Sequence, residues 1–555
     1  MTGNVYAQPL GITLPQQQVS GCSTNPCNLV LVATEQDWLY GYDANVNNTN
    51  NPLWSLNLAG YLGGTAVDCS TYTGSFEVCQ DGSSIVGQYV GVTGTPVIDT
   101  TYIPGTLYVV AAVDIGGTNG TVAYYLFAVD ITTGKPLAYT NNGIMGSVPG
   151  YPPPKLCQSA YPHSGTLNFD NNHIQRSALL FLPENDQVYV AFAAGDPGEA
   201  ENGWLFAYYL NSNGVGQYSF SQTNAFSDTP YGTGGGIWGS GAGPASDGTN
   251  IYLATGNGTI FDPVTQSLPY DLGDTLLRVD SSSLVPKDYY TPWDVLSYQG
   301  TFNNKPCTGL CLCDKDFGSG EVMLFPTAFY FDQNSQSYLN LALNADKQSY
   351  LYVANQAHLG GFNANGGNNI EAVLTPCQMV NNTCQPLESG QGYWASPAYW
   401  SDGTQYWIYY TPTTEDATLK PYTMNGYQLL TSGGAAGPIP QTPTASTTTR
   451  FCKYSPTPSV SWDGKDDSTA IVWAIEHANV DNPTDCNGSD KPAALHAFNP
   501  TTLAELYSSR GLQTPTGPWT TFSVPTIFNG QVYMGTQTYV DVFGLCSTLP
   551  LGCLQ

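Results

Sequence analysis

One stretch, Thr95–Thr140, most constrains the fold of this chain. Its segments Thr106–Asp114 and Tyr124–Asp130 are rich in β-branched and aromatic residues, which suit strands. Short polar side chains and a glycine follow Asp130, so a turn is expected there, and Pro136–Thr140 is predicted to be an outer strand. A single sheet of this size cannot bury both of its apolar faces. It therefore needs further copies of itself along the chain.

The chain supplies eight approximate copies of this four-strand unit. They lie at residues 9–58, 95–140, 176–220, 251–280, 339–356, 395–425, 469–507 and 522–545. Such a series predicts an all-β fold, an eight-bladed β-propeller of four-stranded antiparallel blades, because radial packing buries both faces of each blade. No composition break divides the chain, so residues 1–555 are predicted to form one domain with a short cysteine-containing tail at 546–555. The Gly-, Pro-, Ser- and Thr-rich stretch Thr431–Arg450 is expected to be a surface loop.

The charge balance excludes several kinds of partner. Charged residues make up only 10% of the chain, against a usual quarter, and 14 basic and 42 acidic side chains give a formal charge of −28. Nucleic acid is excluded because there is no basic surface to displace counterions from phosphate. An anionic membrane surface is excluded for the same reason. At low pH the carboxylates would lose their charge and self-repulsion would stay modest, so the protein is expected to tolerate acid.

The 14 cysteines indicate a disulfide-stapled protein of an oxidising compartment. No paired C-x₂-C knuckle for zinc and no C-x-x-C-H for haem c is present. Cysteines close in sequence are expected to close short loops. These pairs are Cys22 with Cys27, Cys69 with Cys79, Cys377 with Cys384, and Cys546 with Cys553. The sequence leaves open the connectivity of Cys157, Cys307, Cys311, Cys313, Cys452 and Cys486.

Further features favour an extracellular or cell-surface location. Sequons of the type N-x-[ST] make five asparagines glycosylation candidates: Asn47, Asn119, Asn257, Asn381 and Asn487. No run of 18 apolar residues exists, so no membrane span is expected. The first residues have neither a basic start nor an apolar core, so a leader, if the protein is exported, is expected to be absent from this sequence.

The repeat LFAVDITTGKPLA at residues 126–138 resembles the quinoprotein-type propeller repeat, which has the pattern A-x-D-x-x-T-G-K. More narrowly, the chain resembles secreted bacterial PQQ-binding-like β-propellers. The stretches that carry this resemblance include TEQDWLYGYDA at Thr34–Ala44, GGIWGSGAGPASDGTNIYLATGNG at Gly235–Gly258, PAALHAFNPTTLAELYSS at Pro492–Ser509 and FSVPTIFNGQVYMGTQTYVDVFG at Phe522–Gly544. The resemblance covers the whole chain in order and implies the propeller fold.

The same resemblance raises the alternative of a PQQ- and calcium-dependent alcohol or sugar dehydrogenase. Quinoprotein alcohol dehydrogenases have an adjacent Cys-Cys pair, an indole under the quinone and a calcium held by acidic and amide groups. This chain has no Cys-Cys dipeptide, and no acidic motif matches the calcium site. We therefore expect neither a cofactor nor a metal nor catalytic residues. The weak candidates for lining a central funnel are His173, Arg176 and Trp238, with blade packing or a structural hydrogen bond as the simpler interpretation of each.

The eighth copy indicates a different function. It has three recognisable strands, whereas an N-terminal segment commonly supplies a fourth strand in propellers. An outer edge without a partner can accept a strand from another chain. We hypothesise a structural or adhesive extracellular propeller that self-assembles through its chain ends into a surface array or filament. In the opposing interpretation, the Cys546–Cys553 loop caps this edge within one subunit. A third hypothesis is a module that binds glycans or peptides through rim loops rich in Tyr and Trp.

Overall fold

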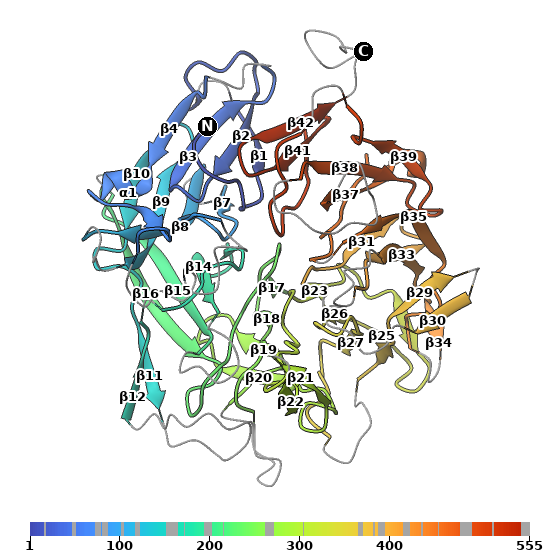
Figure 1. The fold of residues 1–555 in the computed structure, drawn as a ribbon. Helices are drawn as coiled ribbons and strands as arrows, with labels where there is room; N and C mark the ends of the chain where they lie inside the picture. Colours follow the sequence, from blue (N-terminus) through green and yellow to red (C-terminus); the bar gives the residue numbers. More distant parts are fainter. Residues whose placement is uncertain are drawn as a thin grey trace.

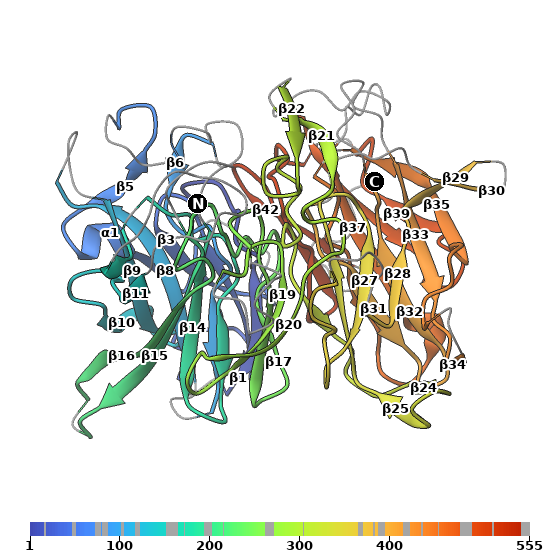
Figure 2. The same cartoon turned by 90° about the horizontal axis from the view of Figure 1, so that it is seen from below.

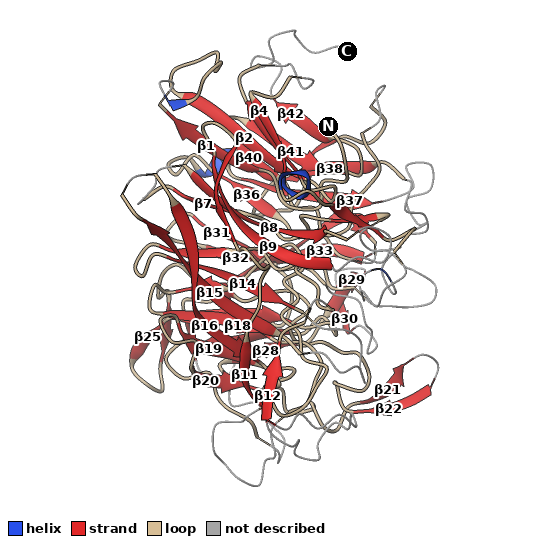
Figure 3. Cartoon of the chain, turned by 90° about the vertical axis from the view of Figure 1, so that its left-hand side faces the viewer, coloured by secondary structure: helices blue, strands red, loops and turns tan. Residues whose placement is uncertain are grey.

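The computed structural model describes most of the chain as strands and connecting turns (Figure 3). The described residues are 1–15, 18–46, 51–72, 79, 87–101, 105–116, 122–150, 165–170, 172–193, 202–214, 216–260, 271–302, 305–363, 370–380, 383–386, 394–413, 422–433, 437–452, 454–477, 491–512 and 516–544. Helical structure in these ranges includes α1 (Leu58–Tyr61) and a 3-10 turn at Asp467–Thr469. Among these residues, no helix combines the length and apolar character that crossing a membrane requires.

Eight antiparallel sheets formed by the described residues follow one another around a ring, and the first sheet lies beside the last (Figure 1). The first four are β1 (Leu10–Leu14), β2 (Cys27–Ala33), β3 (Trp38–Asp43) and β4 (Trp54–Asn57); β7 (Val97–Asp99), β8 (Thr106–Asp114), β9 (Val122–Asp130) and β10 (Lys135–Tyr139); β13 (Leu180–Leu182), β14 (Gln187–Phe192), β15 (Trp204–Ser212) and β16 (Tyr218–Ser227); β17 (Ala245–Ser246), β18 (Asn250–Ala254), β19 (Leu276–Asp280) and β20 (Pro286–Tyr290).

The second half of the chain repeats the pattern, except in the last sheet, which has three described strands. Its sheets are β23 (Met323–Leu324), β26 (Leu341–Ala345), β27 (Leu351–Asn355) and β28 (Ala372–Leu374); β31 (Ala398–Ser401), β32 (Tyr406–Tyr410), β33 (Tyr422–Gln428) and β35 (Ala445–Phe451); β36 (Ser459–Ser461), β37 (Ile471–His477), β38 (Ala493–Phe498) and β39 (Glu505–Ser508); and β40 (Thr526–Phe528), β41 (Gln531–Gly535) and β42 (Val540–Gly544).

Each sheet shares its core with both neighbours, as β8 illustrates. Alternate β8 residues, Tyr108 and Val110 among them, pack with Val190 and Phe192 of the third sheet. The residues between them belong instead to a core shared with β2 of the first sheet. Because successive strand residues point to opposite faces, both faces of β8 are buried, which explains its almost continuous apolar sequence. This radial sharing is the packing of a propeller, so the predicted all-β propeller of antiparallel sheets is confirmed.

The turn after β9 shows how the repeat pattern folds locally. Asp130 accepts hydrogen bonds from the backbone N–H of Thr132 at 2.9 Å and from the Thr133 hydroxyl at 2.8 Å. The chain then needs a positive φ, which Gly134 adopts at 67°. A Cβ at Gly134 would overlap the ring of Trp54, so the same glycine lets the turn pack on the first sheet. The predicted turn is therefore also an inter-sheet contact.

Several short strands lie outside the main sheets. β5 (Thr65–Asp68) and β6 (Tyr89–Val90) extend the second sheet. Hairpins form from β11 (Ser147–Gly150) and β12 (Gly165–Asn168), from β21 (Gln299–Phe302) and β22 (Lys305–Thr308), and from β29 (Cys377–Val380) and β30 (Thr383–Pro386); β24 (Tyr330–Asp332) pairs with β25 (Ser337–Leu339) and β34 (Ser432–Gly433). Seen from the side, the β21–β22 hairpin and β25 project on opposite sides of the ring (Figure 2).

One sequence expectation is wrong. The stretch Thr431–Arg450, expected to be a surface loop, contains β34 and most of β35, the outer strand of the sixth sheet. The threonines of β35 are polar, so the sequence shows no apolar strand pattern there. An outer strand can still form, because it needs β-branched residues for its pleat but not apolar ones for a core. Phe451 at its end is buried against the sixth and seventh sheets.

The disulfides follow the local pairing that the sequence predicted. Cys22 bonds to Cys27, and Cys69 bonds to Cys79. Cys307 bonds to Cys313, a pairing that the sequence left open, and Cys311, Cys377 and Cys452 are also disulfide-bonded. No cysteine in the described ranges is free. Cys157, Cys486, Cys546, Cys553 and the side chain of Cys384 lie outside the described residues, so the predicted pairs Cys377–Cys384 and Cys546–Cys553 stay predictions.

Candidate functional site

The segments that precede the innermost strands meet at the centre of the ring. Arg176, just before β13 of the third sheet, lies with its guanidinium carbon 4.7 Å from the ring centroid of Phe522, just before β40 of the last sheet. Tyr6 and Tyr454 also contact Phe522 edge-on, at 6.1 and 5.9 Å between ring centroids. Sheets that are not neighbours around the ring can meet in this way only near its axis. We call this cluster the hub.

Two of the three sequence-predicted funnel residues come together in the hub. The Arg176 guanidinium lies 5.0 Å from the Trp238 ring centroid, and its Nε donates to the Trp238 carbonyl at 3.3 Å. Burial lowers the pKa of Arg176. No ion pair within 4.0 Å joins Arg176 to a described carboxylate, so its charge is held by aromatic faces and a carbonyl.

His173 occupies a separate position and does not belong to the hub. Its ring lies 4.8 Å from that of Phe169, and its Nδ1 lies 3.0 Å from both the carbonyl and a carboxylate oxygen of Asp170. The Tyr124 hydroxyl donates to the His173 carbonyl at 2.6 Å. His173 is therefore part of the core between the second and third sheets.

A buried lysine, which the sequence did not single out, forms the other charged part of the hub. Lys347 Nζ lies 2.6 Å from Asp314 and 3.0 Å from Asp316, and 5.5 Å from the Trp394 ring centroid. Burial lowers the pKa of Lys347, but the two aspartates raise it by more, so the side chain is an ammonium ion in the folded protein. Asn257 completes the group by donating to Asp314 at 3.2 Å.

The hub side chains do not fit a quinone with a calcium ion. The indoles of Trp238 and Trp394 each have a cation packed near the ring, which would compete with a flat cofactor for that position. Asp314 and Asp316 are already paired with Lys347, and its ammonium would repel a divalent cation placed between them. Within the described ranges, no three His, Cys, Asp or Glu side chains are grouped so as to hold a metal ion.

The outer edge of the last sheet is the second candidate site. β42 pairs with β41 over residues Val540–Gly544, and no described strand pairs with its other side. The other seven main sheets each have a fourth strand at this position. Two of the other outer strands, β10 and β20, begin with a lysine and a proline, residues that discourage strand addition. β42 has neither lysine nor proline.

Apolar side chains lie on and beside this edge. Val542 of β42 is 37% exposed, and Leu506 and Tyr507 of the neighbouring β39 are 57% and 39% exposed. The rings of Tyr507 and Phe543 are in edge-on contact at 6.3 Å, which places β39 next to β42. The edge thus combines backbone groups that pair with no described strand and an apolar surface, which is the composition of a strand-accepting site.

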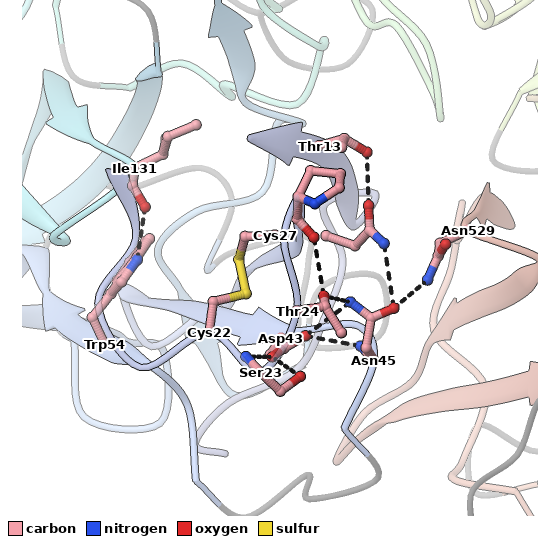
Figure 4. The surroundings of a disulfide bond; sticks show 12 residues. Thr13, Cys22, Ser23, Thr24, Cys27, Asp43, Asn45, Trp54, Ile131 and Asn529 are labelled. Carbon is pink, nitrogen blue, oxygen red and sulfur yellow. Dashed lines mark hydrogen bonds between the residues drawn. A yellow bond between two sulfur atoms is a disulfide. The ribbon is translucent and has the colours of Figure 1, made fainter. Parts of the chain in front are cut away.

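The ring closes beside this edge through contacts other than shared strands. The side chains of Trp38, Tyr40 and Tyr42 form a stacked ladder along one face of β3, with 5.9 Å between successive ring centroids, and pack toward the last sheet. Asn529 of the last sheet donates to Asn45 at 2.9 Å, beside the Cys22–Cys27 disulfide (Figure 4). We call the boundary between the first and last sheets the seam.

The glycosylation candidates divide between buried and undescribed positions. Asn257 is 1% exposed and bonded to Asp314, which leaves no space for a glycan on its amide in the folded chain. Asn47, Asn119, Asn381 and Asn487 lie outside the described residues and stay predictions.

Comparison with known proteins shows similarity to solved structures but not to protein families. No protein-family model matches the chain, and no curated protein matches it. A quinohemoprotein alcohol dehydrogenase from Comamonas testosteroni has a TM-score of 0.49 at 12% identity, over 98% of this chain and 74% of that chain. The corresponding enzyme from Pseudomonas putida HK5 has a TM-score of 0.44 at 12% identity, over 97% and 76%. BamB from Moraxella catarrhalis has a TM-score of 0.42 at 10% identity, over 97% and 99%. At these values, none of the three lends an activity, cofactor or partner to this chain.

Proposed function

We propose that this protein is a non-enzymatic, extracellular structural propeller that assembles with copies of itself into an array or filament. In this proposal, a strand from one copy adds to the free edge of β42 in the next copy. The observation that carries the proposal is the three-stranded last sheet, whose β42 has only β41 as a described partner.

The chemistry around β42 supports a strand as the partner. Backbone N–H and C=O groups on the free side of a β-strand are satisfied best by another strand. The five residues of β42 could pair with a short segment, and the exposed Val542 and Leu506 would supply apolar contact to its side chains. Each apolar side chain covered in this way would contribute about 1 kcal/mol, so several must act together with the backbone hydrogen bonds.

Charge predicts when assembly should occur. At neutral pH each copy carries a formal charge of −28, so copies repel one another. Exposed carboxylates lose their charge near pH 4, which removes most of this repulsion. Assembly is therefore expected to be strongest in acid and to weaken as the pH rises toward 7. The disulfides are consistent with such an extracellular setting.

The test is to place a charge on the free edge with Val542→Lys. Wild-type protein at about pH 4 should form oligomers or filaments in electron microscopy and analytical ultracentrifugation, and the variant should remain monomeric. Val285→Lys is the matched control, because Val285 is also exposed but lies in the turn between β19 and β20. Circular dichroism would establish that both variants fold.

Two results would overturn the proposal. A wild-type protein that stays monomeric in acid and at neutral pH would remove the need for a partner strand. Assembly that both lysine variants support equally well would mean that copies associate through a surface other than β42.

A further inference from the structure

A polar cavity opens at the seam, where loops of the first, second and last sheets meet. Its volume is about 420 Å³. Gln36 enters it from the turn between β2 and β3, and Tyr89 enters it from β6. Gln537 and Tyr539 come from the connection between β41 and β42. A cavity of this size lies within the usual range for small-molecule binding sites.

The described residues that line this cavity carry no charged side chain. Four of them, Asn4, Gln36, Gln88 and Gln537, have primary amides, and two, Tyr89 and Tyr539, have phenol rings. A charged ligand would therefore find no oppositely charged side chain among these described lining residues. Amides and phenols both donate and accept hydrogen bonds, so the lining suits a ligand that does the same.

Some of these polar groups have no hydrogen-bond partner in the part of the chain that the structure describes. Among the described residues, no hydrogen bond engages the Gln36 side chain or the hydroxyls of Tyr89 and Tyr539. Tyr539 is 60% exposed, so its ring face is available at the mouth of the cavity. Gln88, by contrast, is held in place because its amide nitrogen donates to Asp68 at 3.2 Å.

We propose that the seam cavity binds a neutral saccharide. Adjacent hydroxyl groups of a sugar both donate and accept hydrogen bonds, as the amide side chains do. The apolar C–H face of a pyranose ring can pack on a tyrosine ring while its hydroxyls reach the amides and phenols. Because no described lining residue has a charged side chain, acidic sugars and phosphates are disfavoured, and the volume suits a small oligosaccharide.

The test uses the full chain and a panel of neutral trisaccharides: maltotriose, mannotriose and chitotriose. Saturation-transfer NMR would detect contact with the sugar protons, and isothermal titration calorimetry would measure the affinity. At least one trisaccharide should bind. Tyr539→Ala should weaken its binding about tenfold, because it removes the exposed aromatic face. Gln36→Met, which keeps the length of the side chain but removes the amide, should weaken binding as well.

Tyr338→Ala is the matched control, because Tyr338 is an equally exposed tyrosine on β25, outside the cavity. It should bind the sugar as the wild type does. Failure of all three sugars to bind would overturn the proposal, and so would equal effects of the two tyrosine variants. Binding of a neutral tripeptide at this cavity in place of the sugars would also overturn it. Val542→Lys should still bind the sugar. A failure of sugar binding can therefore be told apart from a failure of assembly through β42.

Discussion

Replacing Glu321 with glutamine would test whether buried acids make this propeller more stable in acid. Glu321 is 1% exposed, and its Oε2 accepts a hydrogen bond from the Ala254 backbone N–H at 3.3 Å. Its other oxygen has no hydrogen-bond partner within the described residues. Burial raises the pKa of Glu321 to about 8, although backbone hydrogen bonds oppose the rise. The folded protein therefore keeps this carboxyl protonated at pH 7, whereas the unfolded chain ionises it.

The size of the effect follows from the difference between the two pKa values. The pKa of Glu321 rises from 4.5 in the unfolded chain to about 8 in the folded protein. Because the folded state binds the proton more tightly, this contribution to the free energy of unfolding is fully present below pH 4.5. It is lost as the pH rises through 8, and amounts to about 3–5 kcal/mol over that interval. Glutamine cannot titrate, so the variant should lack this part of the pH dependence.

The assay is denaturant unfolding followed by circular dichroism at about pH 4, 6 and 8. Relative to wild type, Glu321→Gln should gain about 3–5 kcal/mol of unfolding free energy between pH 4 and pH 8. Some slope should remain, because burial also raises the pKa of Glu35 and of Asp346 to about 8. Asp463→Asn is the control, since that carboxyl is exposed and its pKa is lowered by backbone hydrogen bonds. If the free energy of unfolding changed with pH in the same way for wild type and Glu321→Gln, the raised pKa of Glu321 would not contribute to stability in acid.

Two further substitutions test the packing described above, both by denaturant unfolding. Gly134→Ala should destabilise the fold by about 2–4 kcal/mol, because the new side chain would sit at a positive φ and clash with Trp54. The control Gly464→Ala, also at positive φ but in open space, should cost only about 1 kcal/mol. Equal costs for the two variants would mean that the Trp54 contact is unimportant. Lys347→Met should lower the free energy of unfolding by about 3–5 kcal/mol, because it leaves Asp314 and Asp316 without their cation. The control Lys287→Met, at an exposed ion pair, should lower it by less than about 1 kcal/mol. A mild effect at Lys347 would mean that the two aspartates take up protons instead.

Local sequence predicted those strands whose residues are apolar on both faces. The boundaries of β8 match the expected Thr106–Asp114, because every position before the final Asp carries a β-branched, aromatic or other apolar residue. β35 was missed for the opposite reason, because its threonines favour a pleated strand while lacking the apolar character that signals a buried one. The pattern of apolar residues therefore indicates which segments are buried more reliably than it indicates which segments pair as strands.

The hub was predictable only in part. Arg176 belongs to a family-like segment and Trp238 is an indole that could face a central funnel, and the structure brings the two side chains together. Lys347 could not be found, because its partners Asp314 and Asp316 lie 33 and 31 residues away on another segment. That meeting depends on how the inner segments converge at the axis. Local patterns carry no information on such convergence.

The aromatic ladder on β3 has a consequence for how the protein is made. The last sheet, which packs on this ladder, is encoded almost at the other end of the chain. The hydrogen bond across the seam between Asn45 and Asn529 spans 484 residues. At a synthesis rate of about 5–20 residues per second, this aromatic surface emerges from the ribosome about half a minute or more before its cover. During that interval the nascent chain is exposed to unwanted association, and a cell that produces this protein must shield it until the ring can close.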